Sequence, residues 1–167
     1  MDPRLQKLQQ EIASAVAGMS AEELSAHAPG KWCASEILEH LYLTYTGTIK
    51  GFQRVVEAGK PLAATSPTWT HRARTLVVVK FGHLPSGRKS PEVVRPRGVP
   101  AEKVLAEIGR KISEMDDVMT RCEEQFGTRR RLLDHPMLGP LTVAQWRKFH
   151  LVHGMHHVKQ LRRPREA

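Results

Sequence analysis

Apolar side chains recur every three or four residues along four long stretches of the chain. This spacing puts one apolar stripe along a helix, so each stretch predicts an amphipathic helix. No stretch shows a convincing alternation of apolar and polar residues, the pattern of a half-buried strand. We therefore predict an all-α protein with a four-helix bundle as its architecture. The four stretches are residues 3–18, 35–58, 101–126 and 143–162.

Polar residues mark where several of these helices begin. Ser20 with Glu23, and Thr142 with Gln145, have the spacing of a capping box, in which two side chains satisfy backbone N–H groups of the first turn. The first pair predicts a short helical turn, and the second predicts the start of the last long helix. Ser35 is the expected N-cap of the second long helix.

The connection between the second and third long helices is rich in proline. Residues 59–100 hold six of the eleven prolines, which excludes a long regular helix over most of this stretch. Residues 70–81 predict either a short helix or an extended run, because their Leu-Val-Val-Val run fits both periods. Residues 82–100 predict a long crossover or a mobile loop, and residues 129–140 predict a loop.

The composition fits one globular domain spanning residues 1–167. No apolar run approaches the roughly 20 residues that a membrane span needs, so we expect no membrane partner. The first residues lack the apolar region of a secretory signal, which makes the cytoplasm the expected location. The two cysteines, Cys33 and Cys122, are too few for a disulfide framework, and we expect both to be reduced.

The formal net charge of +9 makes nucleic acid a partner to consider. Arginines cluster at residues 129–131 and 162–165, but the other basic residues are spread widely. The chain has no zinc-finger spacing, no RNP-like aromatic string and no P-loop. We interpret both arginine runs as solvated faces, so nucleic-acid binding stays an alternative and an anionic small molecule is the favoured partner.

The last long helix contains a concentrated group of histidines. Four of the nine histidines fall within FHLVHGMHHVKQL. At about 100° per residue, His153 and His157 share one helix face, at the i, i+4 spacing that lets two imidazoles bind one metal ion. His150 and Gln160 lie on the same face, and His156 lies at its edge. We expect this face to point into the protein.

A third histidine would complete an open metal site, because catalytic zinc sites commonly use three protein ligands. His40 is the candidate, since it shares a helix face with Ile37 and with small residues such as Gly47. The alternative is that each histidine is a hydrogen-bonded core residue. Several buried neutral imidazoles need several partners, which favours the metal, but the residues alone leave both interpretations open.

Other polar residues near these ligands have less specific roles. Glu36 and Glu39 flank His40 in sequence, but we interpret them as charges near a helix N-terminus, with Glu39 pointing away from the site. No catalytic residue is assigned. The residues expected to orient the ligands or line the pocket are His150, His156 and Gln160, and His150 is also an alternative to His153 as a ligand. The histidines expected on the surface or in loops are His27, His71, His83 and His135, the last two with an alternative place in the pocket.

A resemblance to the DinB/YfiT-like superfamily rests on two motifs, KWCASEILEHL at residues 31–41 and HGMHHVKQ at residues 153–160. The longer stretch at residues 135–161 is similar to the DUF1569 branch of that superfamily. The resemblance implies a four-helix bundle, often dimeric, with a divalent metal held by three histidines. On this chain those histidines are His40, His153 and His157. Characterised relatives include thiol-dependent S-transferases and a maleylpyruvate isomerase, so the resemblance implies no single reaction.

These inferences favour a metal-dependent enzyme. We expect a divalent transition metal (zinc, nickel, iron or manganese) to activate water or a thiol, which predicts a hydrolase or an S-transferase that uses a low-molecular-weight thiol. The expected substrate is a small molecule, and the expected assembly is a homodimer. The alternatives are a non-catalytic metal-binding bundle and a basic nucleic-acid-binding protein. A structural ion would need a fourth protein ligand, and the sequence offers no good candidate.

Overall fold

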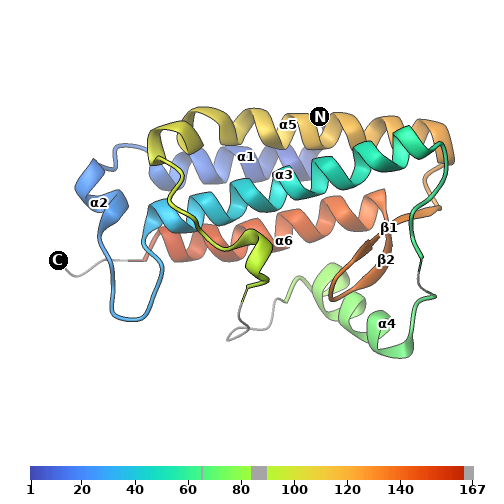
Figure 1. The fold of residues 1–167 in the computed structure, drawn as a ribbon. Coiled ribbons are helices and arrows are strands. Elements are labelled where there is room, and N and C mark those ends of the chain that lie inside the picture. The colour runs from blue at the N-terminus through green and yellow to red at the C-terminus, as the bar shows by residue number, and fades with distance from the viewer. Residues whose placement is uncertain (65, 84–89, 164–167) are drawn as a thin grey trace.

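The computed structural model describes residues 1–64, 66–83 and 90–163. In these residues the protein is mostly helical, with one small two-stranded sheet (Figure 1). The α-helices are α1 (Pro3–Val16), α2 (Ala21–Ser25), α3 (Ala34–Ala58), α4 (Trp69–Thr75), α5 (Ala101–Phe126) and α6 (Val143–Leu161). The π-helix η1 (Leu76–Lys80) continues α4, and η2 (Glu92–Val94) is a single 3₁₀ turn. The strands are β1 (Arg131–His135) and β2 (Gly139–Thr142).

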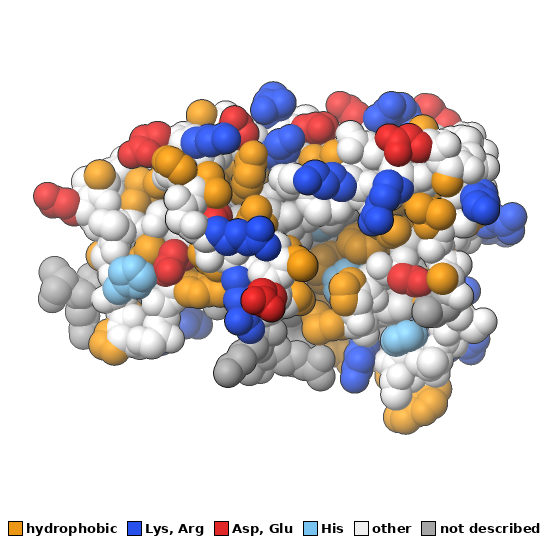
Figure 2. Space-filling model, viewed as in Figure 1, with side chains coloured by type: hydrophobic (Ala, Val, Ile, Leu, Met, Phe, Trp, Pro, Cys, Tyr) orange, Lys and Arg blue, Asp and Glu red, His pale blue; other side chains and the backbone are white. Residues whose placement is uncertain are grey.

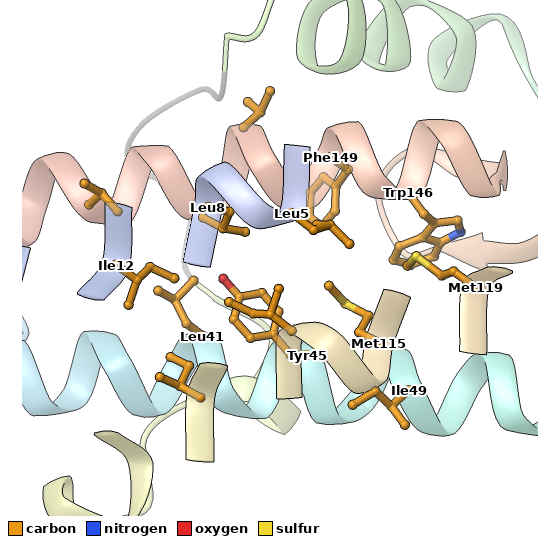
Figure 3. Packing of buried hydrophobic residues seen from close by; sticks show 14 of the residues in the cluster. Leu5, Leu8, Ile12, Leu41, Tyr45, Ile49, Met115, Met119, Trp146 and Phe149 are labelled. Carbon is orange, nitrogen blue, oxygen red and sulfur yellow. The ribbon is translucent and has the colours of Figure 1, made fainter. Parts of the chain in front are cut away.

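The four long helices α1, α3, α5 and α6 lie side by side along the length of the molecule (Figure 1). Helix α3 packs mainly on α5, and α1 packs mainly on α6. The long connection after α3 brings the chain back to the end where α3 began, so α3 and α5 run parallel (Figure 1). Apolar side chains of all four helices meet in one interior, as Leu8, Tyr45, Met115 and Trp146 show (Figure 3).

The long helices agree with the predicted stretches to within two residues at either end. Both predicted capping boxes are present, because Ser20 and Thr142 accept from the N–H groups of Glu23 and Gln145, whose side chains accept in return. The spacing of residues three and four positions apart was sufficient to predict both capping boxes, because capping depends on neighbours within one helical turn.

Helix α3 begins one residue earlier than predicted. Cys33 rather than Ser35 is the N-cap, and its backbone N–H donates to Glu36 Oε2 at 2.9 Å. Glu36 therefore has the helix N-terminal role expected of it. The helix ends at Gly59, whose φ of 61° lies in the left-handed region that glycine adopts without strain.

The prediction of a loop at residues 129–140, and with it the absence of strands, is wrong. Strands β1 and β2 form an antiparallel hairpin, with an irregularity between Arg131 and Leu133. The irregularity breaks the alternation of apolar and polar residues by which a strand is recognised in a sequence. Pro140 is tolerated in β2 because both strands of a two-stranded sheet are edge strands. His135 closes the turn by accepting at Nδ1 from the N–H groups of Met137 and Leu138.

The proline-rich connection forms short helices that pack on the outside of the long ones. Residues 69–80 are helical rather than extended, as α4 and η1. Helix η1 contacts α6, and η2 contacts α3. Residues 84–89 of the predicted crossover lie outside the described residues. None of the described helices has the length and apolar character needed to cross a membrane.

Candidate metal centre

Three histidine side chains from two helices converge at one end of the long helices. His40 comes from the second turn of α3, and His153 and His157 come from successive turns of α6. The Nε2 atom of His153 lies 3.2 Å from that of His40 and 3.2 Å from that of His157. All three residues are at most 9% exposed. The structure therefore brings together the three residues that the sequence analysis singled out.

Hydrogen bonds to the far side of two rings fix which nitrogen faces the centre. His40 Nδ1 lies 2.7 Å from the carbonyl oxygen of Val94, and His157 Nδ1 lies 2.8 Å from Gln160 Oε1. Both partners are acceptors, so each Nδ1 carries the hydrogen and donates it. A neutral imidazole with its hydrogen on Nδ1 has a lone pair on Nε2. The lone pairs of His40 and His157 therefore both point at His153.

Three imidazoles in this arrangement do not satisfy one another. His153 has one hydrogen to share and two lone pairs facing its Nε2, while its own Nδ1 is buried without a hydrogen-bond partner in the described part of the chain. A buried polar atom left unpaired is costly. A cation placed between the three Nε2 atoms would satisfy all three lone pairs, with His153 then carrying its hydrogen on Nδ1, an N–H that still has no acceptor among the described residues.

The protonation of the three rings suits metal binding. Burial lowers the pKa of His40, and burial with the neighbouring His157 and His40 lowers the pKa of His153 well below its usual value. Burial, reinforced by His40, lowers the pKa of His157 to about 3. The rings are therefore neutral at physiological pH. The neutral imidazole is the form that binds a metal.

The spacing of the nitrogen atoms also fits a transition metal. Nitrogen ligands about 2.0–2.1 Å from a tetrahedral zinc ion lie about 3.3 Å from one another, close to the two separations of 3.2 Å. No cysteine, aspartate or glutamate joins this donor group among the described residues. Three protein ligands without a fourth leave coordination positions open, as in catalytic rather than structural zinc sites.

Two aromatic rings and the chain segment around η2 pack against the three histidines. The ring of Phe149 stacks on His153 with centroids 5.4 Å apart, and Trp32 lies 5.2 Å from His40. Glu39 is 2% exposed and accepts from the N–H groups of Arg97 and Gly98. Glu39 is thus not an ordinary helix N-terminal charge. It anchors the segment that follows η2. Val94, the last residue of η2, orients His40 through its carbonyl oxygen.

The residues expected around the ligands divide into two groups. Gln160 bridges His157 and His156, with its Nε2 atom 3.2 Å from His156 Nε2, so Gln160 hydrogen-bonds one of the three converging rings and His156 hydrogen-bonds Gln160. His150, by contrast, is fully buried among Tyr45 and Trp146 and makes no hydrogen bond with the described residues. It lies outside the donor group and does not replace His153.

None of the other described histidines belongs to the group formed by His40, His153 and His157. His27 and His83 are exposed, and His71 packs beneath the hairpin glycine, Gly139. His135 is 7% exposed and stacks against Phe149 with ring centroids 4.3 Å apart, so its expected surface position is wrong. The turn that His135 closes buries its ring, a consequence of the hairpin that the sequence pattern did not predict.

A second group of potential donors was not anticipated from the sequence. His27, Cys33 and Glu36 have side-chain donor atoms within 4.8 Å of one another at the start of α3. His27 is exposed, and Glu36 is already the partner of the Cys33 backbone N–H. Both Cys33 and Cys122 are free thiols, as expected. This group has no unpaired buried donor comparable with His153.

Comparisons with known proteins identify a family. No curated protein and no solved structure matches the chain. One family model does, described as a protein of unknown function, DUF1569, and it matches residues 4–164. This range includes both helices that carry the three histidines and the hairpin between α5 and α6. The chain belongs to the DUF1569 family.

Proposed function

We propose that this protein is a metal-dependent enzyme that binds one divalent transition metal through His40, His153 and His157. The observation that carries the proposal is the convergence of three buried Nε2 atoms, two of them with Nδ1 committed to an acceptor on the far side. The reaction class is activation of water or of a low-molecular-weight thiol. The protein is then a hydrolase or a thiol S-transferase.

The protein's own residues hold the site ready for such an ion. Val94 and Gln160 keep two lone pairs directed inward, and Phe149 and Trp32 cover the rings and limit water around them. When bound, a divalent metal supplies Lewis acidity, which lowers the pKa of a water or thiol ligand towards neutrality. Zinc, nickel, iron and manganese are all candidates, and the three nitrogen donors do not favour manganese.

The proposal extends to the architecture and setting of the protein. We assign the four long helices to a four-helix bundle of the DinB/YfiT-like type, on the strength of the two histidine motifs and the parallel pair α3 and α5 joined by a long connection. A homodimer and a cytoplasmic location belong to the same proposal. Two free thiols are compatible with a reducing compartment.

Two alternatives are less well supported. A metal held only for stability would favour a fourth protein ligand, and the described residues supply three. A nucleic-acid-binding protein would gather its positive charge in a compact stripe. On the face shown in Figure 2, Lys and Arg side chains alternate with Asp and Glu side chains along α5. This mixture counts against a basic stripe for a polyanion along that helix.

The experiment that tests the metal is elemental analysis of untagged protein. We expect about one transition metal ion per chain in the wild type and loss of that ion in His40→Ala, His153→Ala and His157→Ala. His83→Ala is the matched control, since His83 is exposed and does not belong to the group of converging histidines. A wild type that binds no metal even after incubation with zinc, nickel and manganese would contradict the proposal.

The reaction is tested separately on metal-loaded protein. Loaded wild type is assayed for ester and amide hydrolysis, and for consumption of an electrophile in the presence of small thiols. Activity that falls with each ligand substitution and survives in His83→Ala would support the enzyme. Full metal loading with no turnover in either assay would favour the non-catalytic alternative.

A further inference from the structure

The net positive charge of this chain comes mainly from one segment, because that segment contains no acidic residue. Residues 58–91 contain six of the 26 Lys and Arg residues and none of the 17 Asp and Glu residues. This fifth of the chain therefore contributes +6 of the formal net charge of +9, and the remaining residues contribute +3. The segment includes α4 and η1, which lie outside the four long helices (Figure 1).

The same segment exposes large apolar side chains. Trp69 is 79% exposed and Phe81 is 68% exposed, and Leu76 and Val77 between them are also exposed. Figure 2 shows hydrophobic side chains at the tip of this segment, at the lower right of the molecule. Four of the six exposed large hydrophobic residues among the described residues thus fall within thirteen positions. Isolated exposed apolar residues are common, but several of them within one short helical segment favour an interaction surface there.

A basic groove lies beside the exposed apolar group. It has a volume of about 270 Å³ and runs between α4–η1 and the β1–β2 hairpin. Arg72, Lys80 and Arg131 line it, together with His71, and no acidic residue does. None of these three cations has a carboxylate partner in the described part of the chain. Leu76 belongs to both the groove and the exposed apolar group, so the two features adjoin.

We propose that α4–η1 and its basic groove dock on the surface of an anionic lipid bilayer. Helical segments that bind such interfaces combine aromatic and aliphatic side chains with Lys and Arg, so that apolar groups enter the headgroup region while cations contact lipid phosphates. Trp favours this region because its ring is amphipathic. The cytoplasmic leaflet is negatively charged, which matches a surface with no acidic residue.

This contact differs from a membrane span, because the segment lies on the bilayer and no described helix crosses it. Nucleic acid fits this surface less well than a bilayer does. A phosphate backbone would account for the positive charge but not for the exposure of Leu76, Val77 and Phe81. The proposal does not depend on the metal centre, because none of the three metal-ligand candidates lines the groove or belongs to the exposed group.

Vesicle binding by the full-length protein tests the proposal. The probes are vesicles of phosphatidylcholine with and without about 30 mol % phosphatidylserine, read by co-sedimentation and by Trp fluorescence. We expect binding to the anionic vesicles at least about tenfold tighter than to the neutral ones, weakening as salt rises from about 0.1 M to 0.5 M. A blue shift of emission should accompany binding and should be lost in Trp69→Phe.

Matched variants separate the apolar group from the groove. Trp69→Ser with Phe81→Ser should weaken binding by about tenfold or more, whereas Val93→Ser, at a residue 72% exposed but outside the group, should not. Arg72→Gln, Lys80→Gln and Arg131→Gln together should weaken anionic-vesicle binding by about a hundredfold. Arg110→Gln, at an exposed residue of α5, is the charge control.

Several results would overturn the proposal. Equal affinity for neutral and anionic vesicles would remove the role of the groove, and indifference to the Trp69 and Phe81 substitutions would remove the role of the apolar group. Tighter binding to duplex DNA than to anionic vesicles would assign the surface to nucleic acid. A dimer in solution that the Trp69 and Phe81 substitutions dissociate, with no vesicle binding, would assign the surface to a second copy of the chain.

Discussion

The Nε2 atoms of His40 and His153 lie 3.2 Å apart, although 113 residues separate the two histidines in the chain. A different kind of contact orients each of these two rings. His40 donates to the Val94 carbonyl, whereas His153 stacks on Phe149. The metal site we propose therefore depends on groups that are not ligands, and these groups provide sharper tests than the ligands themselves.

Substitution of Gln160 should weaken metal binding without removing a ligand. Gln160→Ala removes the acceptor for His157 Nδ1–H, so we expect metal affinity to fall by about tenfold or more. Gln160→Glu retains an acceptor and should bind at least as tightly as the wild type. Competition with a chromophoric chelator measures both. The control is His156→Ala, which removes only the other partner of Gln160. Unchanged affinity in Gln160→Ala would mean that this hydrogen bond does not orient His157.

Substitution of Gly154 should disrupt the contact between α1 and α6. A methyl group at Gly154 would collide with the side chain of Leu8, which is fully buried. We expect Gly154→Ala to lower the free energy of unfolding by about 1–3 kcal/mol, despite the better helix propensity of alanine. Urea unfolding measures the change.

Gly47→Ala is the matched control, because Gly47 is exposed in α3 and a methyl group there meets no atom within 4 Å. This control should gain up to about 1 kcal/mol from helix propensity. An equal effect of the two substitutions would show that helices α1 and α6 are not closely packed at this point.

Loss of Asp116 should be costly because it leaves the buried guanidinium of Arg147 without one of its carboxylate partners, the other close one being Glu123. Asp116 accepts from Arg147 Nε at 2.7 Å and from the backbone N–H of Asp2 at 2.6 Å, which joins α5, α6 and the N-terminus. We expect Asp116→Ala to destabilise the protein by about 2–4 kcal/mol in chemical unfolding. Glu11→Ala breaks the exposed pair with Arg162 and should cost under about 1 kcal/mol. A similar small cost at Asp116 would contradict the buried network.

Buried histidines should make the protein less stable in mild acid. Burial lowers the pKa of His135 to about 4, whereas an imidazole in the unfolded chain titrates near about pH 6.5. The unfolded chain therefore takes up a proton first as the pH falls. The stabilisation is complete above about pH 6.5 and is lost as the pH falls towards 4, and we expect a loss of about 1–3 kcal/mol from this residue.

The variant His135→Asn isolates this contribution. Asparagine can accept from the N–H groups of Met137 and Leu138 as His135 does, but it does not titrate. Its free energy of unfolding should depend less steeply on pH between about 6.5 and 4 than that of the wild type. Metal-free protein is used for both, so that acid release of a metal does not contribute. Identical slopes would show that His135 is not buried in its neutral form.

Local spacing was enough to predict the four long helices, both capping boxes and the shared face of His153 and His157. All of these relationships hold within one or two helical turns, so a single helix determines them. His40 was predicted on weaker grounds, from its place in an apolar face. Cys33 is the N-cap of α3 because Glu36 reaches the backbone of that residue rather than that of Ser35, a choice that residue preferences did not distinguish.

The sequence by itself therefore determined the long helices and the residue types on each face. Only the tertiary structure decided that Val94 orients His40, that Glu39 anchors the segment after η2, and that His135 is buried beneath a hairpin. The physical reason is the range of the interactions. Helix formation and capping join residues three or four positions apart, whereas these contacts join residues brought together by tertiary folding, over separations of 54 and more in the first two cases.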